Sequence, residues 1–272
     1  MPHPARELRE RYGRWALIVG ASDGLGAAFA RYAGARGLDL VLVARRADLL
    51  ERQASDLRAS TGAEVRCLTL DLSEPAQQRE LIARSEELEV GLLIYVASKS
   101  NIGPFVEQPL EEHLAGLELN CRGPMVLAHH FARRMRQAGR GGIVLLSSFS
   151  ALVGCPLVAH YAATKAYNLV LAESMWAELR GTVDVLGAVV GVTLTPQMAA
   201  RRPDYSGLLA PPVMTSEEVV EETFRHLGRR GSVVIGRKNR LNALLVTLLP
   251  RSVATMLVGH TTRRISARTS LK

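Results

Sequence analysis

Short runs of apolar residues alternate along this chain with longer segments in which apolar residues recur every three or four positions. Apolar runs bounded by turn residues indicate strands, and the longer period indicates helices. The runs predict strands over residues 15–20, 39–43, 65–70, 92–96, 142–147, 183–192 and 232–235. The periodic segments predict helices over residues 25–36, 76–87, 110–138, 161–179 and 216–227, with a charged helix between the second and third strands that runs through Arg58.

The predicted strands carry few polar residues, which is typical of strands buried on both faces of a parallel sheet. Regular alternation of strand and helix predicts an α/β fold, a single doubly wound Rossmann-type domain with a parallel seven-stranded sheet and helices on both faces. We expect this domain to span residues 1–236. In such a fold a ligand binds beyond the carboxyl ends of the strands.

The last segment, residues 237–272, has a different pattern. Leucines at 241, 244, 245, 248 and 249 recur at helical spacing, and Pro250 ends the helix that they predict. Val253, Met256 and Leu257 indicate another short helix. We therefore expect a short amphipathic helical appendage on the domain rather than a second domain.

Charge is concentrated at that same end. The chain carries 34 Lys and Arg against 26 Asp and Glu, a net charge of +8. The segment 237–272 contains no acidic residue, and its basic residues account for the whole net charge: Arg237, Lys238, Arg240, Arg251, Arg263, Arg264, Arg268 and Lys272. An electrostatic partner is therefore expected at this end, but without a recognition motif we do not expect nucleic acid.

The remaining composition excludes several classes of protein. The three cysteines, Cys67, Cys121 and Cys155, are far apart and odd in number, which favours a reducing compartment over disulfides. No spacing of His or Cys is typical of a metal site, and we expect none. The first residues are charged rather than apolar, and no apolar run is long enough to span a membrane, so we expect a cytoplasmic protein.

A glycine-rich loop lies between the first predicted strand and the first predicted helix. Its residues are Gly20, Ala21, Ser22, Asp23, Gly24, Leu25 and Gly26. Such a loop can be only a turn, but glycines after a first strand also let the backbone approach a pyrophosphate, and the helix N-terminus supplies free N–H groups. The loop therefore indicates a dinucleotide site.

The end of the second strand distinguishes between the two nicotinamide cofactors. Dinucleotide-binding units for NAD place an acidic residue there for the ribose hydroxyl. This chain has Ala44 followed by Arg45 and Arg46. Guanidinium groups bind a phosphate, so the pair favours NADP(H), although two solvated arginines at the start of a helix would look the same.

Tyr161 and Lys165 are four residues apart on a predicted helix, so they share a face. Ser148 lies upstream, at the end of the fifth strand. A phenol is a poor acid at neutral pH, and we expect the ammonium of Lys165 to lower the pKa of Tyr161. Tyr161 would then exchange a proton with a carbonyl or alcohol oxygen that Ser148 holds.

These features together resemble the classical short-chain dehydrogenase/reductase family over nearly all of residues 13–236. The glycine loop, Asp71 after the third strand, Asn120, Ser148, Tyr161 and Lys165 stand in the family's order. Within the family, the glycine loop, Thr195 with Met198 and Ala199, and the Leu-Pro-Arg near the C-terminus are similar to the branch of 17β-hydroxysteroid dehydrogenases and 3-oxoacyl-CoA reductases.

The resemblance implies further roles. Asp71 and Leu72 would contact the adenine side of the cofactor, and Asn120 would hold a water that relays protons to Lys165. Lys165 would also bind the nicotinamide ribose, while Val192 and Thr195 would flank the carboxamide. Ala97 is the one residue that matches the family's Asn-Asn-Ala-Gly motif, which reads Tyr95-Val96-Ala97-Ser98 here. The family's usual Pro-Gly after the sixth strand reads Val190-Gly191.

The resulting hypothesis is an NADPH-dependent ketoreductase. Met198, Tyr205, Leu208, Leu209 and Val213 would form an apolar lid, which suits a bulky ketone of the 3-oxoacyl, polyketide-like or steroid-like kind, although core packing would select the same residues. Two alternatives are an inactive NADP-binding scaffold and an NAD-dependent alcohol dehydrogenase. The family implies a homodimer or homotetramer. The basic appendage would contact a partner subunit, which we favour, an acidic substrate carrier or an anionic membrane.

Overall fold

A computed structural model describes residues 4–195 and 212–269. The central element is a seven-stranded sheet in the order β3-β2-β1-β4-β5-β6-β9, and every neighbouring pair of strands in it is parallel. Its strands are β1 (Trp15–Val19), β2 (Asp39–Ala44), β3 (Val65–Thr69), β4 (Val90–Tyr95), β5 (Gly142–Ser148), β6 (Asp184–Val190) and β9 (Ser232–Val234). The direction in which the sheet is built reverses between β1 and β4, which confirms the doubly wound fold. The expected ligand site therefore lies at the carboxyl ends of these two strands.

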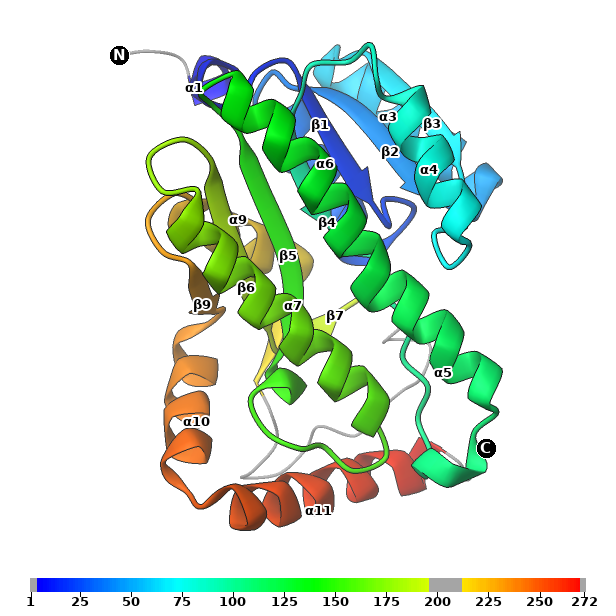
Figure 1. Ribbon diagram of the computed structural model, residues 1–272, viewed down its shortest axis with the longest axis vertical. Helices are drawn as coiled ribbons and strands as arrows, with labels where there is room; N and C mark the ends of the chain where they lie inside the picture. The colour runs from blue at the N-terminus through cyan, green and yellow to red at the C-terminus, as the bar shows by residue number, and fades with distance from the viewer. Residues whose placement is uncertain (1–3, 196–211, 270–272) are drawn as a thin grey trace.

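Helices cover both faces of the sheet (Figure 1). One face is covered by α2 (Gly24–Gly34), α3 (Ala47–Thr61) and α9 (Ser216–His226), and the other by α4 (Pro75–Arg84), α6 (Gly123–Gln137) and α7 (Ala159–Glu178). Neighbouring strand residues enter opposite cores: Ile18 packs with Phe29 of α2, whereas Leu17 packs with Phe131 of α6. The near absence of polar residues in these strands follows from this double burial.

Several elements differ from the prediction. A helix α1 (Pro4–Tyr12) precedes β1, and its charged sequence gave no apolar period to detect. The predicted helix 110–138 is three elements: α5 (Leu110–Leu117), one π-helical turn (Glu118–Arg122) and α6. The strand predicted to end at Val192 stops at Val190, and Val192–Leu194 (β7) instead pairs with Val213–Thr215 (β8) in a separate ribbon.

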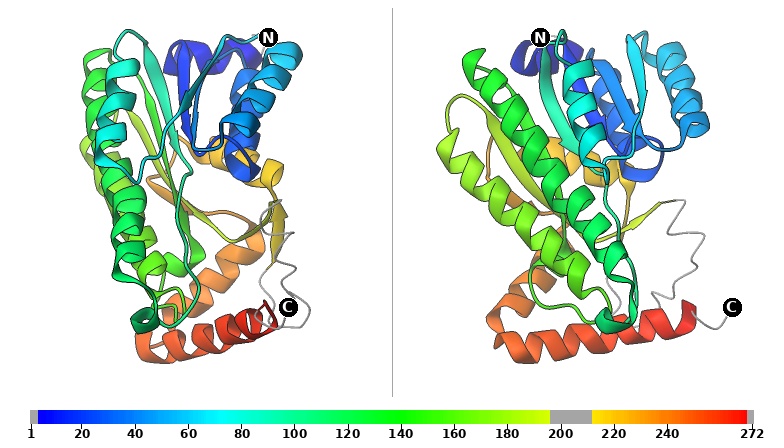
Figure 2. Two further views of the ribbon diagram at one scale, coloured as in Figure 1. Left: turned by 90° about the vertical axis from the view of Figure 1, so that its right-hand side faces the viewer. Right: turned by 45° about the vertical axis from the view of Figure 1, so that its right-hand side comes forward.

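The C-terminal segment forms α10 (Arg237–Leu248) and α11 (Arg251–Thr269), so the second helix is long rather than short. Figure 2 shows α11 lying across the end of the molecule away from the N-terminus. The helix packs on the loop that follows β5: Gly154 faces Thr255, Pro156 faces Gly259, and the Cys155 Sγ lies 3.5 Å from the Thr262 Oγ1. The appendage thus contacts the carboxyl-end side of the sheet, where the ligand site is expected.

Candidate functional site

The glycine loop has the geometry that its sequence predicts. Gly20 has a φ of +89° and lies against the backbone of Ala97, where a Cβ would come within 2.7 Å of a nitrogen. A Cβ on Gly26 would lie 2.0 Å from the Gly20 carbonyl oxygen, so only glycine lets the first turn of α2 approach the end of β1 this closely. The Asp23 Oδ1 accepts a hydrogen bond of 2.7 Å from the Gly24 N–H and caps α2.

An open cleft of about 800 Å³ begins at this loop and crosses the carboxyl ends of the strands. Most of the predicted site residues line it: Gly20, Ser22, Asp23, Gly24, Leu25, Arg45, Arg46, Asp71, Leu72, Ala97, Ser148, Tyr161, Lys165 and Thr195. Three others do not. Gly26 packs behind the loop, Asn120 is fully buried behind the cleft, and Val192 lies on β7 outside the lining.

The two arginines lie at the end of β2, beside the glycine loop. The Arg46 Nη2 donates a 3.2 Å hydrogen bond to the Ser22 Oγ, and it lies 3.7 Å from the Asp23 carboxylate. Arg45 lies 3.5 Å from Asp71, whose carboxyl pKa is held below its ordinary value by hydrogen bonds from Ser73 and by Arg45, against the effect of its burial. Both guanidinium groups are more than half exposed, so an anion in the cleft can reach them.

Tyr161, Ser148 and Lys165 meet at the other end of the cleft. The Tyr161 phenol lies near the side chains of Ser148 and Ser98, and both favour its ionisation. The Lys165 ammonium lies 5.7 Å from the centre of the Tyr161 ring. The serine, tyrosine and lysine that the sequence singled out are therefore neighbours in space.

The expected effect of Lys165 on Tyr161 is wrong. Burial raises the pKa of Tyr161 above its ordinary value, because loss of water disfavours the phenolate more than the two serines stabilise it. Burial also lowers the pKa of Lys165 to about 8. Its ammonium donates a 3.0 Å hydrogen bond to the Leu146 carbonyl oxygen rather than to the phenol.

Sequence reasoning did not single out Ser98. Its hydroxyl contacts Tyr161 from the end of β4, at the position where the family motif has glycine. The one available signal was a hydroxyl residue directly after a central strand. Leu119 and Thr193 also line the cleft without having been predicted.

Asn120 joins three segments. Its Oδ1 accepts from the Lys99 N–H at 2.8 Å, and its Nδ2 donates to the Lys99 carbonyl at 2.9 Å and to the Thr164 Oγ1 at 3.0 Å. Thr164 in turn donates to the Tyr161 carbonyl oxygen at 2.8 Å. The side chain of Asn120 thus ties the loop after β4 to the helix that carries Tyr161 and Lys165.

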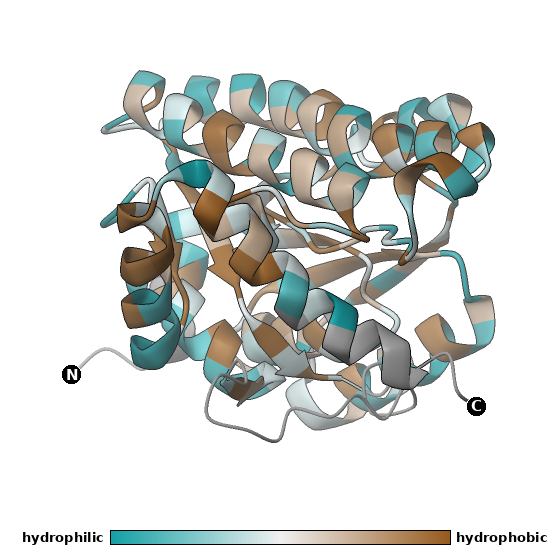
Figure 3. Ribbon diagram, turned by 90° about the horizontal axis from the view of Figure 1, so that it is seen from below, coloured by the Kyte–Doolittle hydropathy of each residue, from teal (hydrophilic) through white to brown (hydrophobic). Residues whose placement is uncertain are grey.

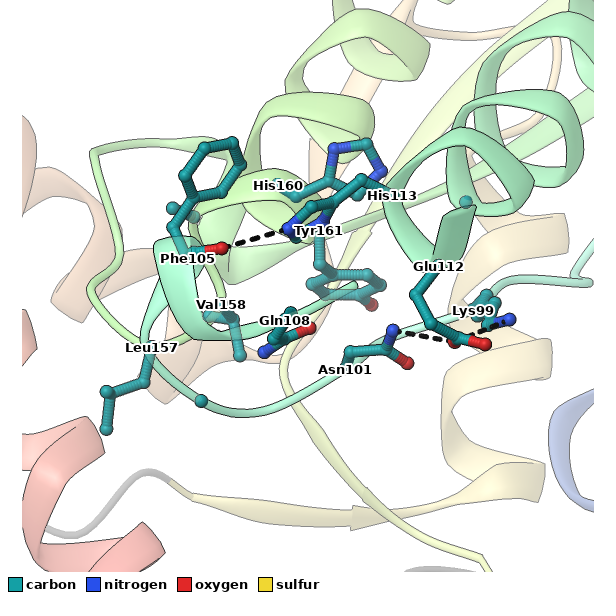
Figure 4. Close-up of a pocket in the computed structure, with 13 residues that line it drawn as sticks. Lys99, Asn101, Phe105, Gln108, Glu112, His113, Leu157, Val158, His160 and Tyr161 are labelled. Carbon is teal, nitrogen blue, oxygen red and sulfur yellow. Dashed lines mark hydrogen bonds and ion pairs between the residues drawn. The ribbon is translucent and has the colours of Figure 1, made fainter. Parts of the chain in front are cut away.

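A small cavity lies on the other side of Tyr161, as Figure 4 shows. Its volume of about 10 Å³ admits one water molecule. The Glu112 carboxylate there pairs with the Lys99 ammonium at 2.7 Å and accepts from the Asn101 Nδ2 at 2.9 Å. The rings of His113 and His160 lie 5.0 Å apart at its edge. The surroundings of Tyr161 on this side are therefore polar.

Replacement of Lys165 by methionine should stabilise the protein at pH 7, because the buried ammonium, 3 % exposed, costs folding energy. The folded pKa of about 8 lies below the unfolded value, so the cost is fully present below pH 8 and disappears as the pH rises past the unfolded value. We expect a gain on the order of 3 kcal/mol for Lys165→Met at pH 7. Urea unfolding at pH 7 and pH 10 measures it; an equal gain at both values would contradict the prediction.

The sequence of this chain is similar to a family model and to several known proteins. A family model described as short chain dehydrogenase matches residues 14–206. A 7beta-hydroxysteroid dehydrogenase of Collinsella aerofaciens is 34% identical over 86% of this chain and 90% of its own length. A very-long-chain 3-oxoacyl-CoA reductase of Coccidioides immitis is 29% identical over 81% of this chain and 63% of its own.

Two solved structures share the fold. One comes from work on the stereoselectivity of 7beta-hydroxysteroid dehydrogenase, with a TM-score of 0.87, 31% identity, and coverage of 92% of this chain and 98% of its own. The other is a short-chain dehydrogenase from Sphingobium yanoikuyae in complex with NADPH, with a TM-score of 0.73, 31% identity, and coverage of 85% and 92%.

Proposed function

Because this chain belongs to the short-chain dehydrogenase family, a family of oxidoreductases, we propose that it reduces a bulky, apolar ketone to a secondary alcohol with NADPH, reversibly. One observation carries the proposal: Ser148, Tyr161 and Lys165 meet at one end of a cleft whose other end is the glycine loop beside Arg45 and Arg46. The residues proposed for proton transfer and those proposed for cofactor binding thus line the same cleft.

The cleft suits NADP(H) in size and in its donors. A volume of about 800 Å³ lies within the range of cofactor sites. The glycine loop and the N-terminus of α2 would hold the pyrophosphate, Arg45 and Arg46 the 2′-phosphate, and Asp71 and Leu72 the adenine side. The solved complex of a relative with NADPH supports this choice. When bound, the cofactor supplies or accepts the hydride.

Tyr161 performs the proton chemistry in this proposal. Its raised pKa keeps the phenol protonated at neutral pH, so its O–H donates to the substrate oxygen as that oxygen gains negative charge. The Ser148 hydroxyl holds the same oxygen. The Ser148 and Ser98 side chains favour the phenolate that remains. The Lys165 ammonium, near the Tyr161 ring, would bind the nicotinamide ribose. In the reverse direction the phenolate accepts the alcohol proton.

The relatives and the expected lid support the proposed substrate class. The named relatives are a 7beta-hydroxysteroid dehydrogenase and a very-long-chain 3-oxoacyl-CoA reductase, and a steroid and a very long acyl chain are both bulky and apolar. Most of the expected lid, with Met198, Tyr205, Leu208 and Leu209, falls outside the described residues. Val213 lies on β8 and is 45% exposed.

Purified protein should therefore consume NADPH with one or more members of a panel of 7-oxosteroids, 3-oxoacyl thioesters and aryl ketones. NADPH that binds tightly but is not consumed with any of them would favour an inactive scaffold. Comparable turnover with NADH would contradict the cofactor assignment and favour the NAD-dependent alternative.

A second copy of the chain would cover the face formed by α5, α6 and α7. Leu114, Leu117, Met125, Tyr167 and Val170 are exposed there by between 39% and 60%. The first two lie on α5, which contacts α7, so the residues form a neighbouring set. We propose a homodimer or homotetramer, which sedimentation of the purified protein would measure.

The appendage presents a second apolar surface, which we call the tail face: Leu241, Leu244, Leu245, Leu248, Val253 and Met256. These side chains are between 45% and 73% exposed. The opposite side of each helix meets the protein, since Asn239, Ala243 and Ala254 are buried. Figure 3 shows hydrophobic residues gathered in α10 and in the first half of α11. No helix of the described residues is long and apolar enough to cross a membrane.

The tail face fits an anionic lipid surface. Arg237, Lys238 and Arg251 flank the leucines, and residues 237–272 hold no acidic residue. Pairing of two tail faces about a two-fold axis would bring these cations together, whereas anionic headgroups would neutralise them while the leucines enter the interface. A cytoplasmic protein would thus hold its substrate end near a membrane that dissolves apolar ketones.

Vesicle binding tests this contact. The protein should co-sediment with phosphatidylglycerol vesicles, more weakly at high salt and little with phosphatidylcholine alone. Leu244→Glu with Leu248→Glu should abolish binding, while Val106→Glu with Leu110→Glu, equally charged changes at exposed apolar positions elsewhere, should not. If the unaltered protein binds no vesicles, and Leu244→Glu with Leu248→Glu changes the mass of the oligomer, a second copy of the chain covers the tail face instead.

A further inference from the structure

The residue that ends β4 is unusual for the family, and its contacts give it a role. Tyr95 is 2% exposed, and its hydroxyl donates a 2.6 Å hydrogen bond to the Leu119 carbonyl oxygen. Burial raises the pKa of Tyr95, so its hydroxyl remains a donor across the physiological range. Leu119 belongs to the π-helical turn that carries Asn120.

The π turn leaves that carbonyl without a donor in its own helix. The Gly123 N–H, which would pair with Leu119 in an α-helix, pairs instead with the Glu118 carbonyl oxygen, five residues back. The next residue along is Pro124, which has no N–H. A buried carbonyl without a partner is costly, and the Tyr95 hydroxyl supplies the missing donor.

Gly123 makes room for this contact. A Cβ at that position would lie 2.4 Å from the Tyr95 hydroxyl oxygen and 3.2 Å from the ring carbon that bears it. Tyr95 thus fits a site formed by Gly123 and Pro124, which lie 28 and 29 residues further along the chain. Together they fix where the π turn bends the helical segment between α5 and α6.

We propose that Tyr95 is a positioning residue that holds the π turn so that Asn120 aligns Tyr161 and Lys165. The adjoining residue, Asn120, bonds to the Thr164 Oγ1, and Thr164 lies between the two reacting side chains on α7 and bonds to the Tyr161 carbonyl. Tyr95 therefore acts on the site through backbone and hydrogen bonds without touching the substrate. The proposal rests on the proposed reductase function.

Tyr95→Phe tests the proposal, with Tyr12→Phe as its matched control. Tyr12 is 1% exposed, and its hydroxyl donates to the Asp184 carboxylate at 3.1 Å. Its ring packs against Gly142 at the amino end of β5, away from the cleft. Loss of the Tyr95 hydroxyl should lower kcat by about ten- to a hundredfold with a small change in the KM for NADPH. Tyr12→Phe should lower thermal stability but leave kcat unchanged.

Amide hydrogen exchange gives a readout that does not need turnover. Exchange in residues 117–124 and 161–166 should accelerate in Tyr95→Phe and not in Tyr12→Phe. Unchanged exchange in these segments would overturn the proposal, whether or not the enzyme reduces any of the tested ketones. A kcat equal to that of the wild type would overturn it as well, and equal losses of kcat in both variants would assign Tyr95 a purely structural role.

The steric fit supplies a further check. Gly123→Ala in the unaltered protein should impair kcat strongly, because the methyl group meets the Tyr95 hydroxyl. The same change combined with Tyr95→Phe should cost less than the two single effects multiplied, because the clash with the hydroxyl is removed. Strictly multiplicative effects would contradict direct coupling between these residues.

Discussion

Tyr161→Phe should lower kcat for ketone reduction by about 10²- to 10⁴-fold, the usual contribution of a positioned general acid. The phenol lies beside Ser148 at the reacting end of the cleft, where it can donate a proton to an oxygen that Ser148 holds. Phenylalanine keeps the ring, so NADPH affinity, measured by fluorescence titration, should change little. Tyr167→Phe, six residues further along α7 and 41% exposed, should leave kcat unchanged.

A small loss in Tyr161→Phe would show that another group protonates the substrate. An unchanged rate with tight NADPH binding would remove the main support for the proposed mechanism. Loss of NADPH binding together with turnover would instead indicate that the ring orders the cofactor end of the cleft.

Arg45→Ala with Arg46→Ala should lower kcat/KM for NADPH by about 10²- to 10⁴-fold, because each charge-assisted hydrogen bond to a 2′-phosphate contributes about 1.5–3 kcal/mol. The efficiency with NADH should change little, so the preference between the cofactors should largely vanish. Both guanidinium groups line the cleft next to the glycine loop. Steady-state kinetics with each cofactor measure the effect.

Arg84→Ala is the control for loss of positive charge, since Arg84 lies on α4 and pairs with Glu80 away from the cleft. It should leave both efficiencies unchanged. If the double variant loses equal efficiency with NADPH and NADH, the arginines hold the loop rather than the 2′-phosphate.

The positions of the strands could be predicted from the sequence, because burial on both faces of the sheet leaves a strong apolar signal. Residues of one strand such as Leu17 and Ile18 enter different cores, so neither position tolerates a polar side chain. The end of each strand was therefore identifiable, and with it the positions of the glycine loop, Arg45 and Ser148. Spacing on a helix placed Tyr161 and Lys165 together for the same geometric reason.

The π turn could not be predicted from apolar spacing, because one extra residue in a helical turn changes the period too little to detect. The turn depends on polar groups rather than on apolar spacing. Pro124 has no N–H to donate, and the hydroxyl of Tyr95, which is distant in sequence, donates to the Leu119 carbonyl oxygen. The pKa values were likewise out of reach. They depend on how deeply Tyr161 and Lys165 are buried, and that burial is set by tertiary packing that apolar spacing does not reveal.

The appendage shows a different limit. The leucine spacing predicted the helix α10, but it left open which side of that helix meets the domain. In the structure the leucines are exposed, and Asn239 on the buried side donates a 2.8 Å hydrogen bond to the Ile235 carbonyl oxygen. Periodicity identifies an amphipathic helix and does not tell which of its sides meets the domain.

The most direct test of the central claim is transfer of deuterium from NADPH labelled at C4 to a ketone that the panel identifies as a substrate. Mass spectrometry should find deuterium on the carbinol carbon of the product made by the wild-type protein, and almost no product with Tyr161→Phe. A reduced product without deuterium, or equal amounts of labelled product from both proteins, would contradict the assignment of this cleft as an NADPH-dependent reductase site that uses Tyr161.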